Sequence, residues 1–227
     1  MEVKPLKTKL FREGDEIVPF VLKHVPRIKN GSVLVISSKI VSLSEGRTAP
    51  LKDRERLIKK ESERARKTKM VWLTIKDGIV MANAGIDESN GNGKLILLPK
   101  DSYKSAARVR NDLKKKYKVK NLGIIIVDSV VMPMRAGVVG IALGYAGFKG
   151  VESYKGKKDL FGRKFKFATS NIADSLATAA MVTMGEGSER QPLAVIENAT
   201  VQFASKVLKS EIKMNQKTDM YGPLFNF

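Results

Sequence analysis

Three acid-bearing segments of this chain have the residue types needed to bind a divalent cation and a phosphate. They are residues 83–90 around Asp87, the pair Asp128-Ser129, and residues 184–187 around Glu186. Each segment places a carboxylate where an apolar run meets a polar or glycine-rich turn. Mg²⁺ prefers oxygen ligands, and proteins commonly bind it through one or two carboxylates together with substrate phosphates. Taken together, the three segments indicate a metal and phosphate site.

Each segment also has an ordinary structural interpretation when it is taken alone. Asp87 and Asn90 are residue types that stabilise Asx turns, and Asp128 is suited to cap the end of a strand. Glu186 alone is typical of an exposed residue at the end of a helix. The metal and phosphate hypothesis therefore depends on the three segments lying together in the folded chain.

Composition excludes several other chemistries. The 227 residues include no cysteine and one histidine, His24, so thiol nucleophiles, disulfides and thiolate zinc sites are excluded. A Ser-His-Asp triad would rest entirely on His24. That residue belongs to an expected amphipathic helix over 17–25, where we expect a packed or surface histidine.

The formal net charge of +19 predicts an anionic partner. Nucleotides, phosphorylated small molecules and nucleic acid all meet this requirement. The chain has no RNP motif, zinc-finger spacing or paired aromatic platform, so nucleic acid is possible but not favoured. No apolar run approaches the roughly 20 residues that span a bilayer. We therefore expect no membrane association and a cytoplasmic protein.

The apolar pattern predicts strands and helices that alternate along one unit. Strands are expected over 32–37, 70–75, 79–82, 95–98, 123–127, 163–168 and 192–197, and helices over 17–25, 101–117 and 171–184. The strand over 123–127 should deliver Asp128 and Ser129 at its carboxyl end, where α/β proteins commonly bind ligands. Glycines alternate with β-branched residues in 135–147, which predicts backbones in close approach or bulged strands.

Five motifs occur in an order that resembles the coenzyme F-420 gamma-glutamyl ligases. They cover residues 37–46, 83–90, 128–144, 158–163 and 184–187, and the likeness runs from about residue 5 to residue 197. The resemblance implies an α/β fold with mixed sheets and two interwoven subdomains in an intertwined homodimer. Within one unit of residues 1–227, it places a nucleotide and metal part at about 1–100 plus 185–227, and a second part at 101–184.

The same resemblance implies a ligase that uses GTP and Mg²⁺ or Mn²⁺, with K⁺ as a further candidate ion. The γ-phosphoryl group would pass to a carboxylate of an anionic acceptor, such as a deazaflavin phospholactate. The amine of L-glutamate would then displace phosphate from this acyl phosphate and form an amide. Catalysis of this kind rests mainly on positioning and on neutralising charge.

By matching position, the resemblance assigns roles to named residues. Those implied in catalysis are Asp87, Asp128 and Arg135, and those implied as metal ligands are Asp87, Asp128, Ser129 and Glu186. Those implied in nucleotide binding are Lys7, Thr8, Lys9, Leu10, Ser38, Lys39, Asn90, Gly185, Gly187 and Ser188. Physical reasoning agrees, because converging carboxylates repel one another unless a cation neutralises them.

The chain departs from the family pattern on the side where the acceptor is expected. Residues 130–134 are Val-Val-Met-Pro-Met, where the family usually has a polar loop that carries arginine. This apolar loop could line an acceptor pocket or a dimer contact. Three hypotheses stay open: a ligase with this or another acceptor, a nucleotide-binding protein of the same fold without ligase activity, and, less favoured, an RNA-associated basic protein.

Overall fold

A five-stranded mixed sheet forms the centre of the computed structural model, which describes residues 1–225. Its strand order is β1 (Glu2–Leu6), β12 (Leu193–Glu197), β2 (Ser32–Ser37), β8 (Leu122–Val131) and β9 (Val138–Ala146). Strands β2 and β8 run parallel, and the other neighbouring pairs are antiparallel. The expected mixed α/β class is therefore confirmed.

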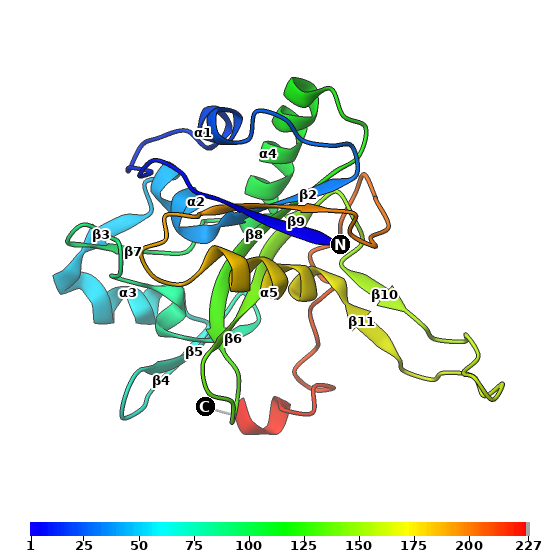
Figure 1. Cartoon of the computed structure of the whole chain (residues 1–227). Helices are drawn as coiled ribbons and strands as arrows, with labels where there is room; N and C mark the ends of the chain where they lie inside the picture. Colours follow the sequence, from blue (N-terminus) through cyan, green and yellow to red (C-terminus); the bar gives the residue numbers. More distant parts are fainter. Residues whose placement is uncertain (226–227) are drawn as a thin grey trace.

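Alternating side chains of β2 and β8 pack into two separate cores, because successive residues of a strand point to opposite faces. Leu34, Ile36, Ile124 and Ile126 pack with residues of α1 (Ile17–His24), α2 (Ser38–Ser44) and α4 (Ser102–Tyr117). Val33, Val35, Ile125 and Val127 pack instead with α5 (Ile172–Met184). In Figure 1, α1 and α4 accordingly lie on one side of the sheet and α5 on the other.

Smaller elements surround this layered centre (Figure 1). Two-stranded sheets pair β3 (Thr48–Pro50) with β7 (Lys94–Ile96) and β10 (Val151–Ser153) with β11 (Thr169–Asn171). A three-stranded sheet contains β4 (Arg64–Lys67), β5 (Trp72–Lys76) and β6 (Ile79–Ala82). The remaining helices are η1 (Leu51–Asp53), α3 (Arg54–Glu61), η2 (Asn83–Gly85) and η3 (Gly222–Phe225).

Most of the expected elements are confirmed near their predicted bounds. Strand β2, the β5–β6 hairpin and strand β12 occur where the apolar pattern placed them. Helix α4 begins after Asp101, whose side chain accepts a hydrogen bond from Lys104 N, and α5 begins after Asn171, which caps it in the same way. Local capping chemistry was therefore sufficient to locate both helix starts.

Two strand predictions were wrong in part. Residues 163–168 alternate in polarity but form no strand, because they lie largely exposed in the arm between β10 and β11; Phe167 is 88% exposed. Strand β8 does not end at Val127 but continues to Val131, since Asp128 and Ser129 pair with Ile141 and Gly140 of β9. Asp128 and Ser129 therefore lie within a strand, after a shift of register between Ile126 and Val127.

The central sheet combines strands from both of the expected subdomains. It takes β8 and β9 from residues 101–184 and its other strands from the remainder of the chain. The two expected parts therefore share one hydrogen-bonded sheet. The division into these parts stays a prediction, and the last two residues of the first part, 226 and 227, lie outside the residues that the structure describes. No helix within residues 1–225 has the length and apolar character needed to cross a membrane.

The close backbone approach expected in the glycine-rich segment is confirmed in β9. A Cβ atom on Gly144 would lie 2.4 Å from the backbone carbonyl carbon of Ser102, at the start of α4. A Cβ atom on Gly140 would lie 2.7 Å from Ala177 O of α5. Helices on both faces of the sheet thus contact β9 directly because these residues lack side chains.

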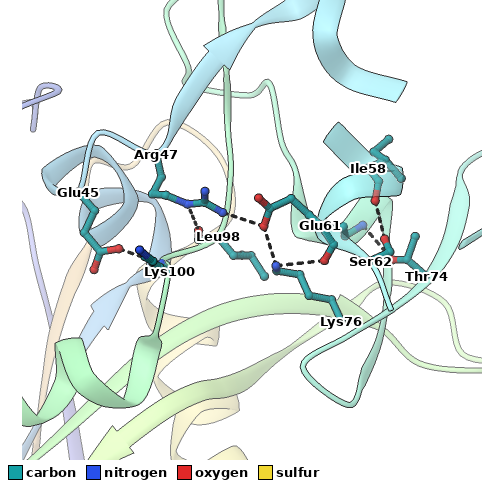
Figure 2. A network of polar contacts seen from close by, with 10 residues as sticks. Glu45, Arg47, Ile58, Glu61, Ser62, Thr74, Lys76, Leu98 and Lys100 are labelled. Atoms are coloured by element: carbon teal, nitrogen blue, oxygen red, sulfur yellow. Dashed lines mark hydrogen bonds and ion pairs between the residues drawn. The ribbon is translucent and has the colours of Figure 1, made fainter. Parts of the chain in front are cut away.

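A network of polar contacts joins α3 to the neighbouring sheets (Figure 2). Glu61 Oε2 accepts hydrogen bonds of 2.7 Å from Arg47 Nη2 and Lys76 Nζ, and Arg47 Nε donates to Leu98 O at 3.0 Å. The Glu61 side chain is 14% exposed. Burial alone would raise the pKa of Glu61, but the hydrogen bonds from Lys76 and Arg47 hold it below its ordinary value of 4.5.

We expect Glu61→Gln to lower the free energy of unfolding by about 1–2 kcal/mol at neutral pH, a value that allows for partial screening by solvent. The pKa of Glu61 is lower in the folded state than in the unfolded state. Its contribution to stability is therefore present at pH values above the unfolded-state pKa and is lost as the pH falls through the folded-state pKa. Urea unfolding of both proteins between pH 7 and pH 3 measures this difference. The exposed Glu55→Gln variant on the same helix should change stability far less, and equal effects of the two would contradict the assignment.

Candidate functional site

A cavity of about 390 Å³ lies where β2 and β8 meet the N-terminal segment and the turn after α5. We call it the first cavity. The residues that line it are 8–11, 37, 39, 40, 43, 87, 89, 90, 96, 127–129, 181 and 184–192. All three acid-bearing segments contribute to it, so the fold brings together residues that are nearly 100 positions apart in the chain.

The parallel pairing of β2 and β8 explains how two of these segments meet. Ser37, the last residue of β2, pairs with Val127 of β8. The next residues, Ser38 and Asp128, therefore lie side by side at the same edge of the sheet. The Ser38 hydroxyl donates a hydrogen bond to the Asp128 carboxylate, and the backbone N–H of Ser129 donates to Asp128 Oδ1 at 2.9 Å.

Asp87 and Lys39 form an ion pair inside the first cavity. Lys39 Nζ lies 2.6 Å from Asp87 Oδ2 and donates to Ser89 Oγ at 2.7 Å. Ser89 in turn donates to both oxygens of Asp87, through its backbone N–H at 2.8 Å and its hydroxyl at 2.7 Å. Burial would raise the pKa of Asp87, but these hydrogen bonds keep it below its ordinary value. Asp87 is therefore charged at neutral pH.

Asp128 is in a different electrostatic state from Asp87. Burial raises the pKa of Asp128 to about 6, and the negative charge of Asp87 adds to this effect. The hydrogen bonds from Ser129 and Ser38 and the charge of Lys39 only partly offset it. The charges of these two carboxylates are balanced by only one neighbouring lysine, so a further cation at this place would be bound favourably.

The N-terminal segment and the turn after α5 form the opposite wall. Thr8 N donates to Arg190 O at 2.8 Å, and Asn90 Nδ2 donates to Gly187 O at 3.5 Å. Lys9 N donates to Nε2 of His24 at 3.2 Å, which leaves Nδ1 of that ring to donate to Phe20 O at 2.9 Å. His24 is therefore a packed histidine, as expected, and it anchors the backbone of Lys9.

The turn after α5 requires glycine at its first position. Gly185 has a φ of +80°, and a Cβ atom there would lie 2.5 Å from Glu189 Cδ. Gly187 N donates to Glu189 Oε2 at 2.8 Å. The Glu189 carboxylate thus holds the turn that presents Glu186 and Ser188 to the first cavity.

The structure gathers most, but not all, of the predicted site residues. Those that line the first cavity are Thr8, Lys9, Leu10, Lys39, Asp87, Asn90, Asp128, Ser129, Gly185, Glu186, Gly187 and Ser188. Ser38 is buried and contacts the cavity through Asp128, whereas Lys7 is not among the lining residues. Arg135 lines a different, second cavity, because β8 continues past Asp128 and carries the following loop away.

Sequence reasoning missed Ser89, Glu189 and Gln191, which also line the first cavity. Ser89 lies between Asp87 and Asn90 in the first motif, so the motif itself contained a signal for it. Glu189 and Gln191 follow the last motif directly, but nothing in their spacing distinguishes them from surface residues. Their positions depend on how the turn folds back on the N-terminal segment.

The donor set fits a divalent cation that shares its coordination with a substrate phosphate. Within residues 1–225, no three Asp, Glu, His or Cys side chains are close enough together to hold a metal ion by themselves. Asp87, Asp128 and Ser129 all line the first cavity. One or two carboxylates completed by phosphate oxygens and water is the arrangement that Mg²⁺ commonly adopts.

Comparisons with known proteins found a family model and relatives that match most of this chain. Residues 5–198 match the family model described as F420-0:Gamma-glutamyl ligase. The chain is 36% identical to the coenzyme F420:L-glutamate ligase of Methanocaldococcus jannaschii over 90% of each chain. It is 31% identical to the enzyme of the same name from Archaeoglobus fulgidus, over 97% of this chain and 96% of that one.

Proposed function

This chain belongs to the F420-0:gamma-glutamyl ligase family and is therefore a ligase of the glutamate-adding type, and from this premise we propose how its first cavity works. The proposed reaction joins L-glutamate to a carboxylate of an anionic acceptor and consumes GTP. The relatives are named for coenzyme F420, so a deazaflavin phospholactate is the acceptor that we propose.

The proposed reaction has two steps. In the first, an oxygen of the acceptor carboxylate attacks the γ-phosphorus of GTP, and the bond between the β–γ bridging oxygen and that phosphorus breaks, which yields an acyl phosphate and GDP. In the second, the uncharged amine of L-glutamate attacks the acyl carbon. Phosphate leaves with the bonding electrons, the nitrogen loses a proton, and an amide remains. Phosphorylation is needed because a free carboxylate is a poor electrophile.

The first cavity supplies the groups that the first step needs. We propose that the Lys39 ammonium contacts triphosphate oxygens; its pairing with Asp87 and Ser89 supports this, because it fixes the position of Lys39 before the nucleotide binds. The backbone of Thr8 to Leu10 and the Gly185–Ser188 turn form the walls in which we place the nucleotide. Preorganised charge of this kind stabilises a transition state without further rearrangement.

Asp87, Asp128 and Ser129 are the residues that we propose to hold Mg²⁺ or Mn²⁺, with Glu186 available to a second ion. When bound, a divalent cation would neutralise phosphate oxygens as the γ-phosphoryl group transfers. K⁺ is a further candidate ion. We also propose that the protein acts as an intertwined homodimer with interwoven subdomains, as the family resemblance implies.

The observation that carries this proposal is the meeting of all three acid-bearing segments in one cavity beside Lys39. Separately, each segment has a structural explanation. Together they form a cavity wall that contains a buried carboxylate whose charge is only partly neutralised. Neighbouring like charges in a low dielectric destabilise the folded state, so such a cluster is more typical of a functional site than of a purely structural one.

An omission experiment tests the proposed function. We expect amide product and phosphate release only when GTP, Mg²⁺ or Mn²⁺, L-glutamate and the deazaflavin phospholactate acceptor are all present, with both products formed in equal amounts. Removing the metal with a chelator should abolish both. Mass spectrometry of the acceptor measures amide formation, and a phosphate assay measures turnover. Phosphate release that is independent of acceptor and glutamate would contradict the proposal, and nucleotide binding without any product would favour a protein of the same fold without ligase activity.

A further inference from the structure

A second cavity, of about 890 Å³, lies next to the first along strand β8. Residues 127–129 of β8 line the first cavity, and residues 130–131 together with the loop 132–135 line the second. A strand rises about 3.3 Å per residue, so the linings of the two cavities come within one residue of each other along β8.

The walls of the second cavity are mainly apolar and aromatic. Met81, Leu98, Val130 and Leu143 form a buried cluster at its base. The rim consists of residues 132–134, Met-Pro-Met, of which Met132 is 43% exposed. Tyr103, Tyr221 and Phe225 also line the cavity. Methionine and aromatic side chains of this kind adapt well to flat, polarisable ligands.

The outer wall comes from the C-terminal segment, residues 209–225, beyond the part of the chain that the family model matches. In Figure 1 this red segment lies beside the green hairpin that joins β8 and β9. It is fixed to the core, because Glu211 Oε2 accepts hydrogen bonds from Tyr145 Oη at 2.6 Å and Gly150 N at 2.9 Å. The second cavity is therefore partly built by residues beyond the region that the family model matches.

Charged side chains of both signs line this apolar space, with Lys76, Lys100, Arg135, Lys209 and Lys213 against Asp77, Asp101, Asp174 and Asp219. Lys100, Arg135 and Lys213 line the second cavity, and none of the three forms an ion pair with another residue among 1–225. By contrast, the lining residues Lys76 and Lys209 are paired with Glu61 and Asp101. The lining has one more cationic than anionic side chain, and three of its cations have no ion-pair partner. An apolar pocket with unpaired cations is suited to a ligand that has a flat apolar body and anionic substituents.

We propose that the second cavity binds the planar aromatic ring of the acceptor, while the anionic arm of the same molecule extends along β8 to the first cavity. This inference rests on the proposed function, and it identifies the residues that select the acceptor. A second copy of this chain is a poorer occupant, because two proteins that each have a net charge of +19 repel one another.

Fluorescence anisotropy of the deazaflavin ring tests the assignment with two probes, the deazaflavin phospholactate and the deazaflavin without its phospholactate arm. We expect Met132→Asp to weaken binding of both probes at least about tenfold, since it places a carboxylate in the apolar rim. Met70→Asp is the matched control, because Met70 is 93% exposed and does not line the cavity. Lys213→Glu should weaken binding of both probes, because Lys213 lines the second cavity, in which the ring is placed.

A second variant and a second readout keep the outcome decisive. Tyr221→Ala should also weaken ring binding, and GTP should still raise the melting temperature of every variant, which shows that the first cavity is intact. Unchanged affinity in both Met132→Asp and Tyr221→Ala would overturn the assignment, as would absence of binding to the wild type. If Met132→Asp changes only the oligomeric state in sedimentation, the surface is an interface and the assignment is wrong.

The same experiment separates this inference from the proposed function. If the wild type forms the amide and the variants bind the ring normally, the proposed function is supported and the cavity assignment is wrong. A wild type whose ring binding depends on Met132 and Tyr221, but which forms no amide, supports the cavity assignment and contradicts the proposed function.

Discussion

Asp128→Asn is expected to reduce GTP-dependent amide formation by about a thousandfold or more. The carboxylate of Asp128 lies in the first cavity beside Lys39 and Asp87, and burial leaves it without full neutralisation. An asparagine keeps the shape and can still accept hydrogen bonds from Ser38 and Ser129, but it supplies no negative charge to a cation. The loss should therefore appear in turnover, measured as amide product per enzyme with saturating substrates.

A stability measurement and a matched control show whether turnover is lost through the missing carboxylate or through unfolding of the variant. Because a buried carboxylate with a raised pKa is replaced by a neutral group, we expect the Asp128→Asn protein to be at least as stable as the wild type. Asp112→Asn, at an exposed position on α4, should leave turnover unchanged. If Asp128→Asn retained more than about a tenth of wild-type turnover while Asp112→Asn behaved normally, Asp128 would not be a metal ligand in the reaction.

The Gly144→Ala variant is expected to lower the free energy of unfolding by about 3 kcal/mol. The new Cβ atom would lie 2.4 Å from Ser102 C and 2.6 Å from Tyr103 N, so it would collide with the backbone of α4 rather than with a flexible side chain. Neither β9 nor the start of α4 can move away without disturbing the packing between them. Denaturant unfolding monitored by circular dichroism measures the change.

Gly187→Ala is the matched control for this prediction. Both substitutions reduce the entropy of the unfolded chain equally, so this contribution cancels in the comparison. At Gly187 the nearest atom to a new Cβ is 3.3 Å away and belongs to the end of the Glu189 side chain, which can rotate. We expect Gly187→Ala to change stability by less than about 1 kcal/mol. Equal losses at the two positions would mean that the approach between β9 and α4 is not tight.

Much of the local structure was predictable because it depends on short-range chemistry. Asp101 and Asn171 cap helices through hydrogen bonds to the backbone three residues ahead, and Asp77-Gly78 makes the turn of the β5–β6 hairpin. The run over 32–37 has no polar residue between its two serines, as a strand buried on both faces requires. Such signals lie within a few residues of the elements that they specify.

The strand predicted at 163–168 shows where local signals fail. Alternation of polarity there is as good as in a true strand, but a strand also needs a continuous ladder of hydrogen bonds in one register. Residues 163–168 donate to and accept from residues 154–159 across the arm, for example from Phe165 N to Lys157 O, but only Lys158 and Lys164 form a bridge. The end of β8 shows the converse, because pairing with β9 extends that strand through Asp128 and Ser129. In both cases the pairing with another segment, and not the polarity pattern of the strand itself, determined the outcome.

For the candidate site, residue types and motif order were sufficient to indicate carboxylates, a lysine and a glycine turn, because these functional groups are required wherever a cation and a phosphate bind. Only the tertiary structure showed that Lys39 pairs with Asp87, that burial raises the pKa of Asp128, and that Arg135 lies in the second cavity. The physical reason is that chemical identity is a property of single residues, whereas distance, burial and charge coupling arise between residues that strand pairing brings together. The parallel register of β2 and β8 places Ser38 beside Asp128, and no pattern within either segment specifies that register.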